Sequence, residues 1–370
     1  MSLKEIFCQD KAISILQRAF AADKMPHAYI FAGLEGIGKF KTAREWAKLL
    51  LCKNPVVENE FANSCGQCQS CRLLEAGSHP DFNLIYKELL EFTKDGKGKT
   101  TPVDLPVDVV REFLIEKVSI KPTLSARKVF IVSEAERLNA SSQNAMLKVL
   151  EEPPQYCSII LLCTRMERLL PTTRSRCRII RFSPIAEERI IDKLKEMGIE
   201  QKKAQYFARL AQGSLGQACQ WARLELAGAN LYQTKKELLT SLSGFKYADA
   251  LQLAQWLLGQ SKEIAAVWAD LDKNTSKTDI NRRAAKTLVQ IIISALHDAV
   301  KLNLAGQGEI INFDQKEQIE SIAKHFGPEQ SAEKIADCYE TLRWIESAVN
   351  EKLIFDHLLL NLAASDIMKV

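Results

Sequence analysis

The first half of the chain alternates between short apolar runs and segments with helical periodicity. Such runs, bounded by polar or turn-forming residues, are typical of buried strands in a parallel sheet; they span 28–32, 82–86, 128–132 and 158–162, with a further strand-like run at 179–182. Helical patterns lie between them, such as Thr42 to Leu51 and Ser142 to Glu152, and Pro153-Pro154 ends the second. The pattern predicts a parallel α/β domain over residues 1–182.

After Phe182-Ser183-Pro184 the periodicity is helical to the end of the chain, and we find no convincing strand. One cluster of helices is predicted from Glu187 to about Arg223, and a longer helical stretch begins near Lys246. Loop signals interrupt this stretch at 259–261, 274–276 and 306–308. We therefore expect two further domains, a small helical domain over 183–243 and a larger helical domain over 244–370.

Composition narrows the range of functions without identifying one. The 370 residues include 50 basic and 46 acidic side chains, for a net charge of +4, so the chain is neither a disordered polyelectrolyte nor a uniformly basic nucleic-acid coat. No stretch approaches the roughly 18 apolar residues that span a membrane, and the N-terminus lacks the pattern of a signal peptide. We expect a cytoplasmic protein with no membrane partner, whose ten cysteines are reduced.

A phosphate-binding loop is predicted directly after the first strand. Gly33, Gly36, Gly38 and Lys39 fit the pattern G-x-x-x-x-G-K, in which backbone N–H groups surround phosphates and the lysine reaches the outer ones. The next position should carry a Ser or Thr hydroxyl that binds Mg²⁺, but Phe40 occupies it. Binding of ATP is therefore doubtful, and productive metal coordination more so.

An acidic pair that such a site needs is also incomplete. The aspartate that supports Mg²⁺ should follow the strand 128–132, and Ser133 takes its place, followed by Glu134 and Glu136. Glu134 keeps the position of a water-orienting glutamate but has no metal-binding neighbour. The alternative interpretation is that Glu134 and Glu136 are solvated charges at the start of a helix.

Four cysteines have the spacing of a metal site. Cys65, Cys68 and Cys71 form C-x₂-C-x₂-C, and Cys52 lies thirteen residues upstream of Cys65. Four thiolates complete a tetrahedral Zn²⁺ shell, which leaves no position for a catalytic water, so we predict one structural zinc in a module at about 52–71. A redox C-x-x-C pair is the alternative. The other six cysteines are expected to be buried packing residues: Cys8, Cys157, Cys163, Cys177, Cys219 and Cys338.

The most basic stretch has six arginines against one acid, Glu167; the arginines are Arg165, Arg168, Arg174, Arg176, Arg178 and Arg181. For most of them a solvated rim is the simplest interpretation. Arg176 differs because it precedes a strand at the edge of the domain. An arginine there could reach the γ-phosphate held by a neighbouring subunit, as an arginine finger does.

Several motifs together resemble the bacterial clamp-loader branch of the AAA+ proteins. They are the phosphate loop, the cysteine module, His27 to Phe31, His79-Pro80-Asp81, Asn144 to Pro154 and Ser175-Arg176-Cys177. The resemblance covers about the first 220 residues well, and the last 130 only as helices. It implies an AAA+ parallel-sheet domain with an inserted zinc module, a small helical lid domain and a C-terminal helical collar that holds the subunits in a ring.

The departures from the family's motor subunits (gamma and tau) favour its non-motor, or stator, kind of subunit. Phe40 and Ser133 replace metal-binding positions, and Gly216 stands where the lid of a motor subunit carries a sensing arginine. The resemblance then implies a non-catalytic subunit of a DNA-directed DNA polymerase holoenzyme. It implies a hetero-pentamer with the motor subunits and a delta subunit, contact with the sliding clamp and primer-template DNA through the complex, and Arg176 acting in trans.

Two other functions stay open at this point. The chain is an active clamp-loader ATPase if an unusual set of ligands replaces the missing metal-binding positions. Alternatively, it is a zinc-dependent DNA-binding module, which predicts tight DNA binding by the isolated chain with a steep salt dependence.

Overall fold

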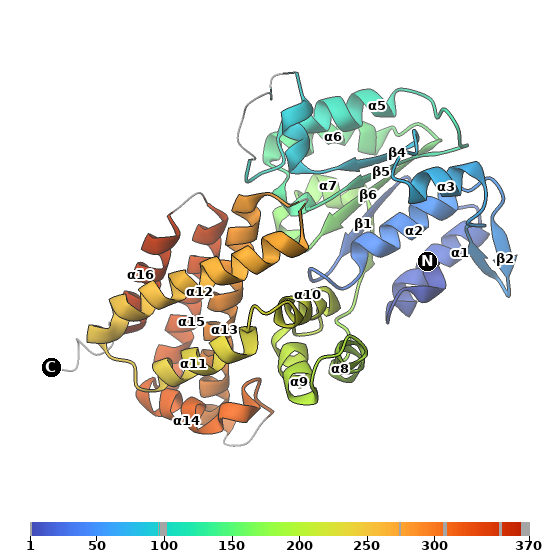
Figure 1. The fold of residues 1–370 in the computed structure, drawn as a ribbon. Helices are drawn as coiled ribbons and strands as arrows, with labels where there is room; N and C mark the ends of the chain where they lie inside the picture. Colours follow the sequence, from blue (N-terminus) through green and yellow to red (C-terminus); the bar gives the residue numbers. More distant parts are fainter. Residues whose placement is uncertain are drawn as a thin grey trace. The chain divides into compact units, whose positions relative to one another are not determined.

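The computed structural model describes residues 2–94, 96, 102–273, 275–305, 309–347 and 350–363. The chain forms two compact units, Met1–Ile185 and Ala186–Val370 (Figure 1). The first contains a mixed α/β fold, and the described residues of the second form helices and no strand. The finer division of the second unit into a lid (183–243) and a collar (244–370) remains a prediction.

The first unit is built on a five-stranded parallel sheet in the order β4-β5-β6-β1-β7. The strands are β1 (Ala28–Ala32), β4 (Phe82–Ile85), β5 (Lys128–Val132), β6 (Cys157–Cys163) and β7 (Arg178–Arg181). All five expected strands are confirmed to within a residue or two. In this order β1 lies between β6 and β7, the last two strands of the unit in sequence. This is the arrangement of an AAA+ phosphate-loop domain, and it confirms the predicted fold class.

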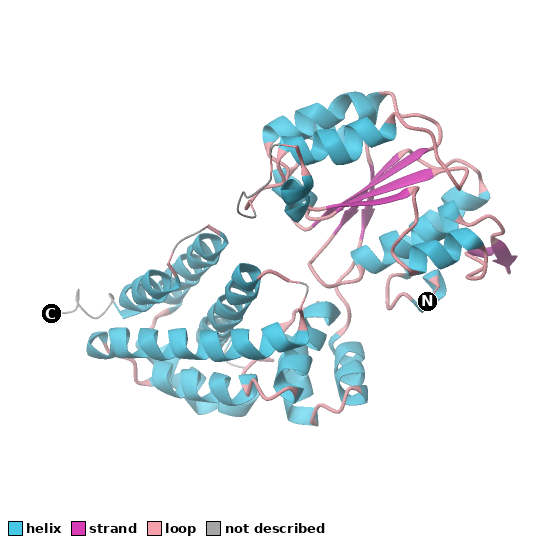
Figure 2. Ribbon diagram, turned by 45° about the horizontal axis from the view of Figure 1, so that its top comes forward, coloured by secondary structure: helices cyan, strands magenta, loops and turns pink. Residues whose placement is uncertain are grey.

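Both faces of the sheet are buried because successive side chains of a strand point to opposite faces. On one face, strand residues pack with α1 (Asp10–Ala21) and α2 (Lys39–Leu51); this core includes Leu16, Tyr29, Phe31, Trp46, Ile131, Ile160 and Ile180. On the other, they pack with α6 (Ala140–Glu151) and the helical segment 107–118; this core includes Ile30, Val110, Leu114, Phe130, Met146, Leu150 and Leu161. Figure 2 shows the sheet with helices on both sides. The continuous apolar runs of the sequence reflect this double burial.

The helices of the first unit are α1 (Asp10–Ala21), α2 (Lys39–Leu51), α3 (Gln69–Glu75), α4 (Val107–Val110), α5 (Glu116–Val118), α6 (Ala140–Glu151) and α7 (Pro171–Ser175). A π-helical segment, Arg111–Ile115, joins α4 to α5. A small antiparallel hairpin, β2 (Val56–Glu58) with β3 (Phe61–Asn63), precedes the three clustered cysteines. The sequence pattern did not predict this hairpin, because three-residue strands are too short to display periodicity.

The second unit consists of α8 (Glu187–Glu196), α9 (Gln201–Leu210), α10 (Leu215–Leu226), α11 (Leu231–Ser243), α12 (Ala250–Leu271), α13 (Lys277–Ala305), α14 (Lys316–His325), α15 (Pro328–Glu346) and α16 (Glu351–Ala363). The loop expected at 259–261 is wrong, because these residues continue α12. A single Gly259 costs only about 1 kcal/mol in a helix, and burial of the neighbouring Leu257 and Ser261 favours continuation. The loop expected at 306–308 lies outside the described residues.

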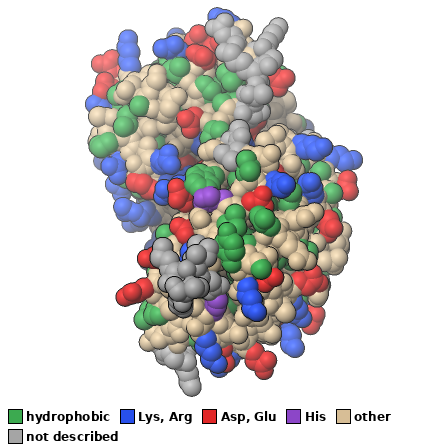
Figure 3. All heavy atoms as spheres, turned by 90° about the vertical axis from the view of Figure 1, so that its left-hand side faces the viewer, with side chains coloured by type: hydrophobic (Ala, Val, Ile, Leu, Met, Phe, Trp, Pro, Cys, Tyr) green, Lys and Arg blue, Asp and Glu red, His purple; other side chains and the backbone are tan. Residues whose placement is uncertain are grey.

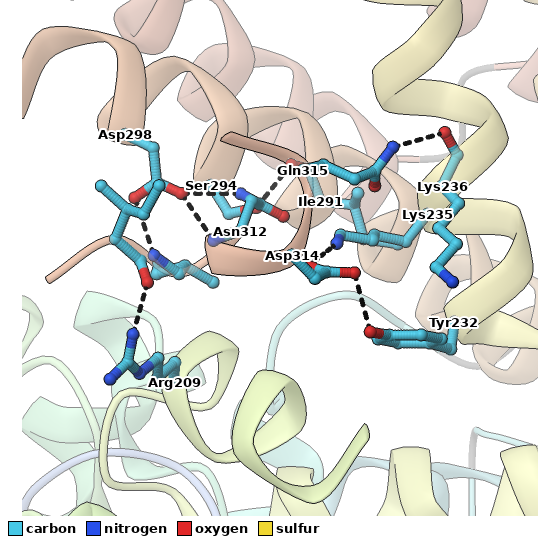
Figure 4. A network of polar contacts seen from close by, with 12 residues as sticks. Arg209, Tyr232, Lys235, Lys236, Ile291, Ser294, Asp298, Asn312, Asp314 and Gln315 are labelled. Carbon is cyan, nitrogen blue, oxygen red and sulfur yellow. Dashed lines mark hydrogen bonds and ion pairs between the residues drawn. The ribbon is translucent and has the colours of Figure 1, made fainter. Parts of the chain in front are cut away.

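A buried polar network joins the helices of this unit (Figure 4). Lys235 on α11 has no exposed surface and pairs with Asp314 at 2.5 Å, and Tyr232 donates to the same carboxylate at 2.7 Å. Burial alone would raise the pKa of Asp314, but these partners outweigh burial and lower it. Asp298 on α13 accepts backbone N–H groups of Ile311 and Asn312. The segment from Ile311 to Asp314 is thus fixed between α11 and α13.

One helix corrects an expectation about membranes. Within α13, Lys277–Leu304 is long and apolar enough to cross a bilayer by length and composition, and its most apolar 18-residue window has a mean hydropathy of 1.2. The helix packs against α12, α14 and α15, and 61% of its most apolar window is buried. This burial is what the central helix of a helical bundle needs. On the face drawn in Figure 3, acidic and basic side chains are interspersed with small groups of apolar ones.

Candidate functional site

The predicted nucleotide-site residues of the first unit lie at the carboxyl edge of the sheet. The loop 33–38 follows β1, Ser133 follows β5, and Thr164 follows β6, and β6 lies between the other two strands. In parallel sheets this edge is where ligands bind, because strand ends and helix N-termini converge there. The fold therefore gathers residues that are far apart in the sequence.

The phosphate loop has the expected backbone. Gly38 has a φ of +103° at the N-cap of α2, a conformation that residues with a Cβ avoid. A Cβ on Gly33 would lie 2.5 Å from Ile37 Cδ1 and 2.9 Å from the Phe182 carbonyl oxygen. These glycines are therefore required by the fold itself, whether or not a nucleotide binds.

Lys39 is directed back onto its own loop. Its Nζ donates to the carbonyl oxygens of Gly33 and Leu34, each at 2.6 Å, and its side chain is buried. Burial lowers the pKa of Lys39, and the carboxylates of Glu136 and Glu35 offset part of the effect. The ammonium that would reach a phosphate is thus satisfied by backbone oxygens.

The metal-binding hydroxyl is missing from the first turn of α2. Phe40 follows Lys39, and the residue is 42% exposed, so it belongs to no buried core. Thr42 is fully buried and donates its hydroxyl to the Gly38 carbonyl oxygen at 3.0 Å. Because this bond lies within the helix, Thr42 does not replace the missing ligand.

The acidic residues after β5 have protein partners. Glu134 adopts a left-handed conformation (φ +48°) and forms an ion pair with Arg137 at 3.0 Å. Glu136 accepts hydrogen bonds from the hydroxyl and the backbone N–H of Thr164. Glu136 is therefore not a solvated charge, and it links the ends of β5 and β6. In the second unit, Gly216 lies in the first turn of α10 and offers no side chain.

The four predicted cysteines come together in one cluster. Cys52 caps the end of α2, Cys65 and Cys68 lie in the loop after β3, and Cys71 lies on α3. Their sulfur atoms all lie within 4.8 Å of one another; Cys52 Sγ is 3.5 Å from Cys65 Sγ and 4.0 Å from Cys68 Sγ. These separations are far longer than a disulfide bond of about 2.05 Å, so no disulfide joins these four cysteines in this structure.

The cluster fits a tetrahedral metal ion. Sulfurs about 2.3 Å from a central zinc lie about 3.8 Å apart, close to the separations found. Backbone N–H groups point at the sulfurs, from Cys65 to Cys52 at 3.3 Å and from Cys68 to Cys65 at 3.4 Å. Such bonds stabilise the thiolate form that binds metal.

The surroundings divide the four thiols into two kinds. Burial raises the pKa of Cys52 and Cys71. At Cys68 burial acts in the same direction, but N–H groups of Cys71 and Lys53 outweigh it and lower the pKa to about 6. The Gln67 N–H lowers the pKa of Cys65. Cys68 thus ionises readily near neutral pH, and a bound cation would favour the thiolate form of the other three.

A buried hydrogen-bond cluster anchors the cysteine module to the sheet. Ser70, beside Cys71, donates to the Leu51 carbonyl oxygen at 2.6 Å and lies 2.7 Å from His79 Nε2. His79 Nδ1 accepts the Asp81 N–H at 3.0 Å, so Nε2 carries the ring hydrogen and donates to Ser70. A donor nitrogen cannot activate the Ser70 hydroxyl, and the cluster is therefore structural.

Arg176 lies at the C-cap of α7, immediately before Cys177 and β7. Its guanidinium donates to the Thr172 carbonyl oxygen at 2.9 Å and pairs with Glu151 at 2.5 Å. The side chain keeps about a third of its surface exposed. Arg176 is thus oriented by its neighbours and still accessible from solvent.

Comparisons with known proteins decide the family. Residues 8–186 match the family model described as "DNA polymerase III, delta subunit", and residues 274–364 match "DNA polymerase III, delta subunit, C terminal". The DNA polymerase III subunit delta-prime of Escherichia coli (strain K12) is 29% identical over 350 residues, which cover 94% of this chain and 92% of the relative. The chain belongs to the DNA polymerase III delta-prime family.

Other relatives match shorter parts of this delta-prime family member. The delta-prime subunit of Pseudomonas aeruginosa is 39% identical over 151 residues, 41% of each chain. The subunit tau/gamma of Haemophilus influenzae is 31% identical over 217 residues, 57% of this chain and 29% of the relative. Similarity to both delta-prime and tau/gamma subunits agrees with an α/β fold that the two kinds of subunit share. The replaced metal-binding positions, Phe40 and Ser133, are what distinguish the two kinds here.

Sequence reasoning missed some partners in this delta-prime family member. It assigned no role to Glu151, although the residue lies within the motif 144–154, and it did not pair Glu136 with Thr164. These contacts join segments at least 25 residues apart, which spacing cannot reveal. Burial was also overestimated for three of the six cysteines expected to be buried. Cys157, Cys163 and Cys338 are buried, but Cys177 and Cys219 are only partly buried and Cys8 is exposed.

Proposed function

We propose that this chain is the non-motor subunit of a bacterial clamp loader. In this role it helps to load the sliding clamp onto primed DNA in the cytoplasm and does not hydrolyse ATP itself. Membership of the delta-prime family supports the assignment. The observation that carries it is a phosphate loop whose glycine scaffold is intact while Phe40 and Ser133 replace the metal-binding residues.

The loss of hydrolysis follows from what phosphoryl transfer requires. Mg²⁺ must neutralise the developing charge on the phosphates, and it needs a hydroxyl and a carboxylate that this chain lacks at both positions. Lys39 already donates to two loop carbonyl oxygens, so a nucleotide has to displace these bonds before it gains the lysine. Gly216 removes the cationic side chain that the lid of a motor subunit supplies. Together these changes favour a rigid subunit over a motor.

Arg176 supplies the chain's contribution to catalysis, in the site of a neighbouring motor subunit. Its guanidinium is partly exposed and is held at the end of a short helix. A group that contacts another subunit needs both this exposure and a fixed position. An arginine in its own incomplete site would have no charge to stabilise. In trans, it would stabilise the charge on the γ-phosphate and so couple the neighbour's hydrolysis to ring assembly.

The cysteine cluster holds one structural zinc. Four sulfur ligands without an oxygen donor favour Zn²⁺, and a closed four-ligand shell has no position for substrate or water. A bound ion would cross-link three segments, namely the end of α2, the helix α3 and the loop that follows β3. The partners in this proposal are the gamma/tau motor subunits and a delta subunit, in a hetero-pentamer that binds the clamp and primer-template DNA.

Steady-state ATPase of the reconstituted complex tests the proposal. Arg176→Ala should reduce the rate stimulated by DNA and clamp, because a finger is worth about 10³ to 10⁵ at the site that it completes. The purified chain alone should turn over no ATP. Arg174→Ala, on the same helix, is the matched control and should leave the rate unchanged.

Three results would contradict this assignment. An unchanged rate with Arg176→Ala would remove the trans role. Turnover by the isolated chain that disappears with Lys39→Ala would identify an active motor subunit instead. Tight, strongly salt-dependent DNA binding by the isolated chain would favour the DNA-binding module.

A further inference from the structure

The Arg176 guanidinium has two close acceptors of different kinds, besides a longer contact of 3.4 Å with the Ser175 hydroxyl. One is the Thr172 carbonyl oxygen, one turn back along α7, at 2.9 Å from the guanidinium NH1. The other is the Glu151 carboxylate, which approaches NH2 at 2.5 Å and comes from a different helix. Among the described residues, no ion pair joins the neighbouring arginines Arg168, Arg174, Arg178 and Arg181 to an acid. Arg176 thus has a carboxylate partner where these four arginines have none in the described part of the chain.

Glu151 occupies a position that is unfavourable for an acid by itself. It is the last residue of α6, where the helix carbonyl groups place partial negative charge, and Pro153-Pro154 prevents the helix from continuing. A carboxylate at a helix C-terminus is destabilising unless a cation neutralises it. The Arg176 guanidinium provides that cation, so each group compensates the other in the free chain.

We propose that Glu151 is a positioning residue. It holds Arg176 away from the active site of the neighbouring subunit until a nucleoside triphosphate bound there competes for the guanidinium. The inference rests on the proposed trans role of Arg176. A guanidinium N–H that donates to Glu151 is not available to a γ-phosphate, so the ion pair opens when the finger engages. Thr172 keeps its hydrogen bond to NH1 and retains the arginine near α7 during the exchange.

The strength of the ion pair suits a reversible restraint. Arg176 is 32% exposed and Glu151 47%, and solvent screening reduces the net stabilisation by such a pair. Charge-assisted bonds to phosphate, made in a site closed by a neighbour, are stronger. The ion pair therefore disfavours binding of Arg176 to the γ-phosphate while the subunits are loosely associated. It breaks when clamp and DNA bring the subunits together.

Glu151→Gln in the reconstituted complex tests this proposal, because it removes the charge while preserving size. ATPase without DNA and clamp should rise about two- to fivefold, the factor expected for the loss of a half-exposed ion pair. The fully stimulated rate should stay the same. Glu152→Gln, a neighbouring exposed acid, is the matched control and should change neither rate.

The double variant Glu151→Gln/Arg176→Ala separates the restraint from a general structural role. If Glu151 acts through Arg176, the double variant should have the same unstimulated rate as Arg176→Ala alone. An unstimulated rate that is unchanged or lower in Glu151→Gln, while Arg176→Ala lowers the stimulated rate, overturns the restraint but keeps the finger. No effect of Arg176→Ala on either rate overturns the proposed trans role of Arg176, and with it the premise of this inference.

Discussion

The cysteine cluster and the phosphate loop are both short motifs of the α/β unit, but they differ in completeness. The cluster brings together four sulfurs, the full shell of a tetrahedral ion, within 4.8 Å. The loop keeps its glycines and Lys39, while Phe40 and Ser133 leave its metal site without the usual ligands. One motif thus retains every atom that its chemistry needs, and the other retains mainly its backbone.

The difference follows from how each site is built. The cysteine shell comes from one local module between the end of α2 and the start of α3, and loss of any ligand would leave the module open. A nucleotide site draws on three strand ends, a second domain and a neighbouring subunit. Once hydrolysis is not required, its side chains can change, but Gly33 and Gly38 persist because the fold itself requires them.

The largest effect is expected from breaking the complete site. Cys68→Ser removes the thiol with the lowest pKa, about 6, and with it a ligand of the predicted zinc. Because structural zinc contributes directly to folding, the first unit should lose about 5 kcal/mol or more of its free energy of unfolding. Thermal unfolding and elemental analysis, which should find about one zinc per wild-type chain, measure the two consequences.

Cys8→Ser is the matched control for this change, since Cys8 is exposed and outside the cluster. It should keep both the metal and the stability. A wild-type chain that is purified without metal and is insensitive to a chelator would contradict the comparison, because the four cysteines would then only pack.

A smaller effect is expected from the incomplete site. Lys39→Ala removes two charge-assisted bonds to the loop and relieves the burial of an ammonium, so it should destabilise the first unit by about 1–2 kcal/mol. The ATPase of the reconstituted complex should stay unchanged. The control is Lys41→Ala, an exposed neighbour. A large loss of complex ATPase with Lys39→Ala would show a working nucleotide site and abolish the contrast.

Sequence patterns were sufficient where a feature depends on neighbouring residues. The five strands, the loop 33–38 and the cysteine spacing each lie within one local segment, and the structure places them as expected. The alternation of strands and helices predicted a parallel sheet, and the structure has one. The strand order β4-β5-β6-β1-β7 then agreed with the AAA+ class. The hairpin at Val56–Asn63 was missed because its strands are too short for periodicity.

Long-range partners were beyond the reach of those patterns. Arg176 was singled out by its position, but its pairing with Glu151 depends on how α6 and α7 pack. The contact of Glu136 with Thr164 likewise depends on the adjacency of β5 and β6. In the second unit, Lys235 is fully buried although lysine is usually exposed, because Asp314 lies 79 residues away in sequence and beside it in space.

The smallest expected effect concerns His79, in the hydrogen-bond cluster that anchors the cysteine module to the sheet. Burial lowers the pKa of His79, with Asp81 opposing and Lys53 assisting the shift. An unfolded histidine titrates near 6.5, so below that pH the unfolded chain binds more protons and stability should fall, by at most about 1.4 kcal/mol per pH unit for one proton. His79→Asn keeps an acceptor for the Asp81 N–H and cannot titrate. Denaturant unfolding at pH 7.5 and 5.5 should show a weaker pH dependence for this variant than for the wild type. Equal dependence in the two would show that other groups, such as His297, whose pKa burial also lowers, set the acid sensitivity.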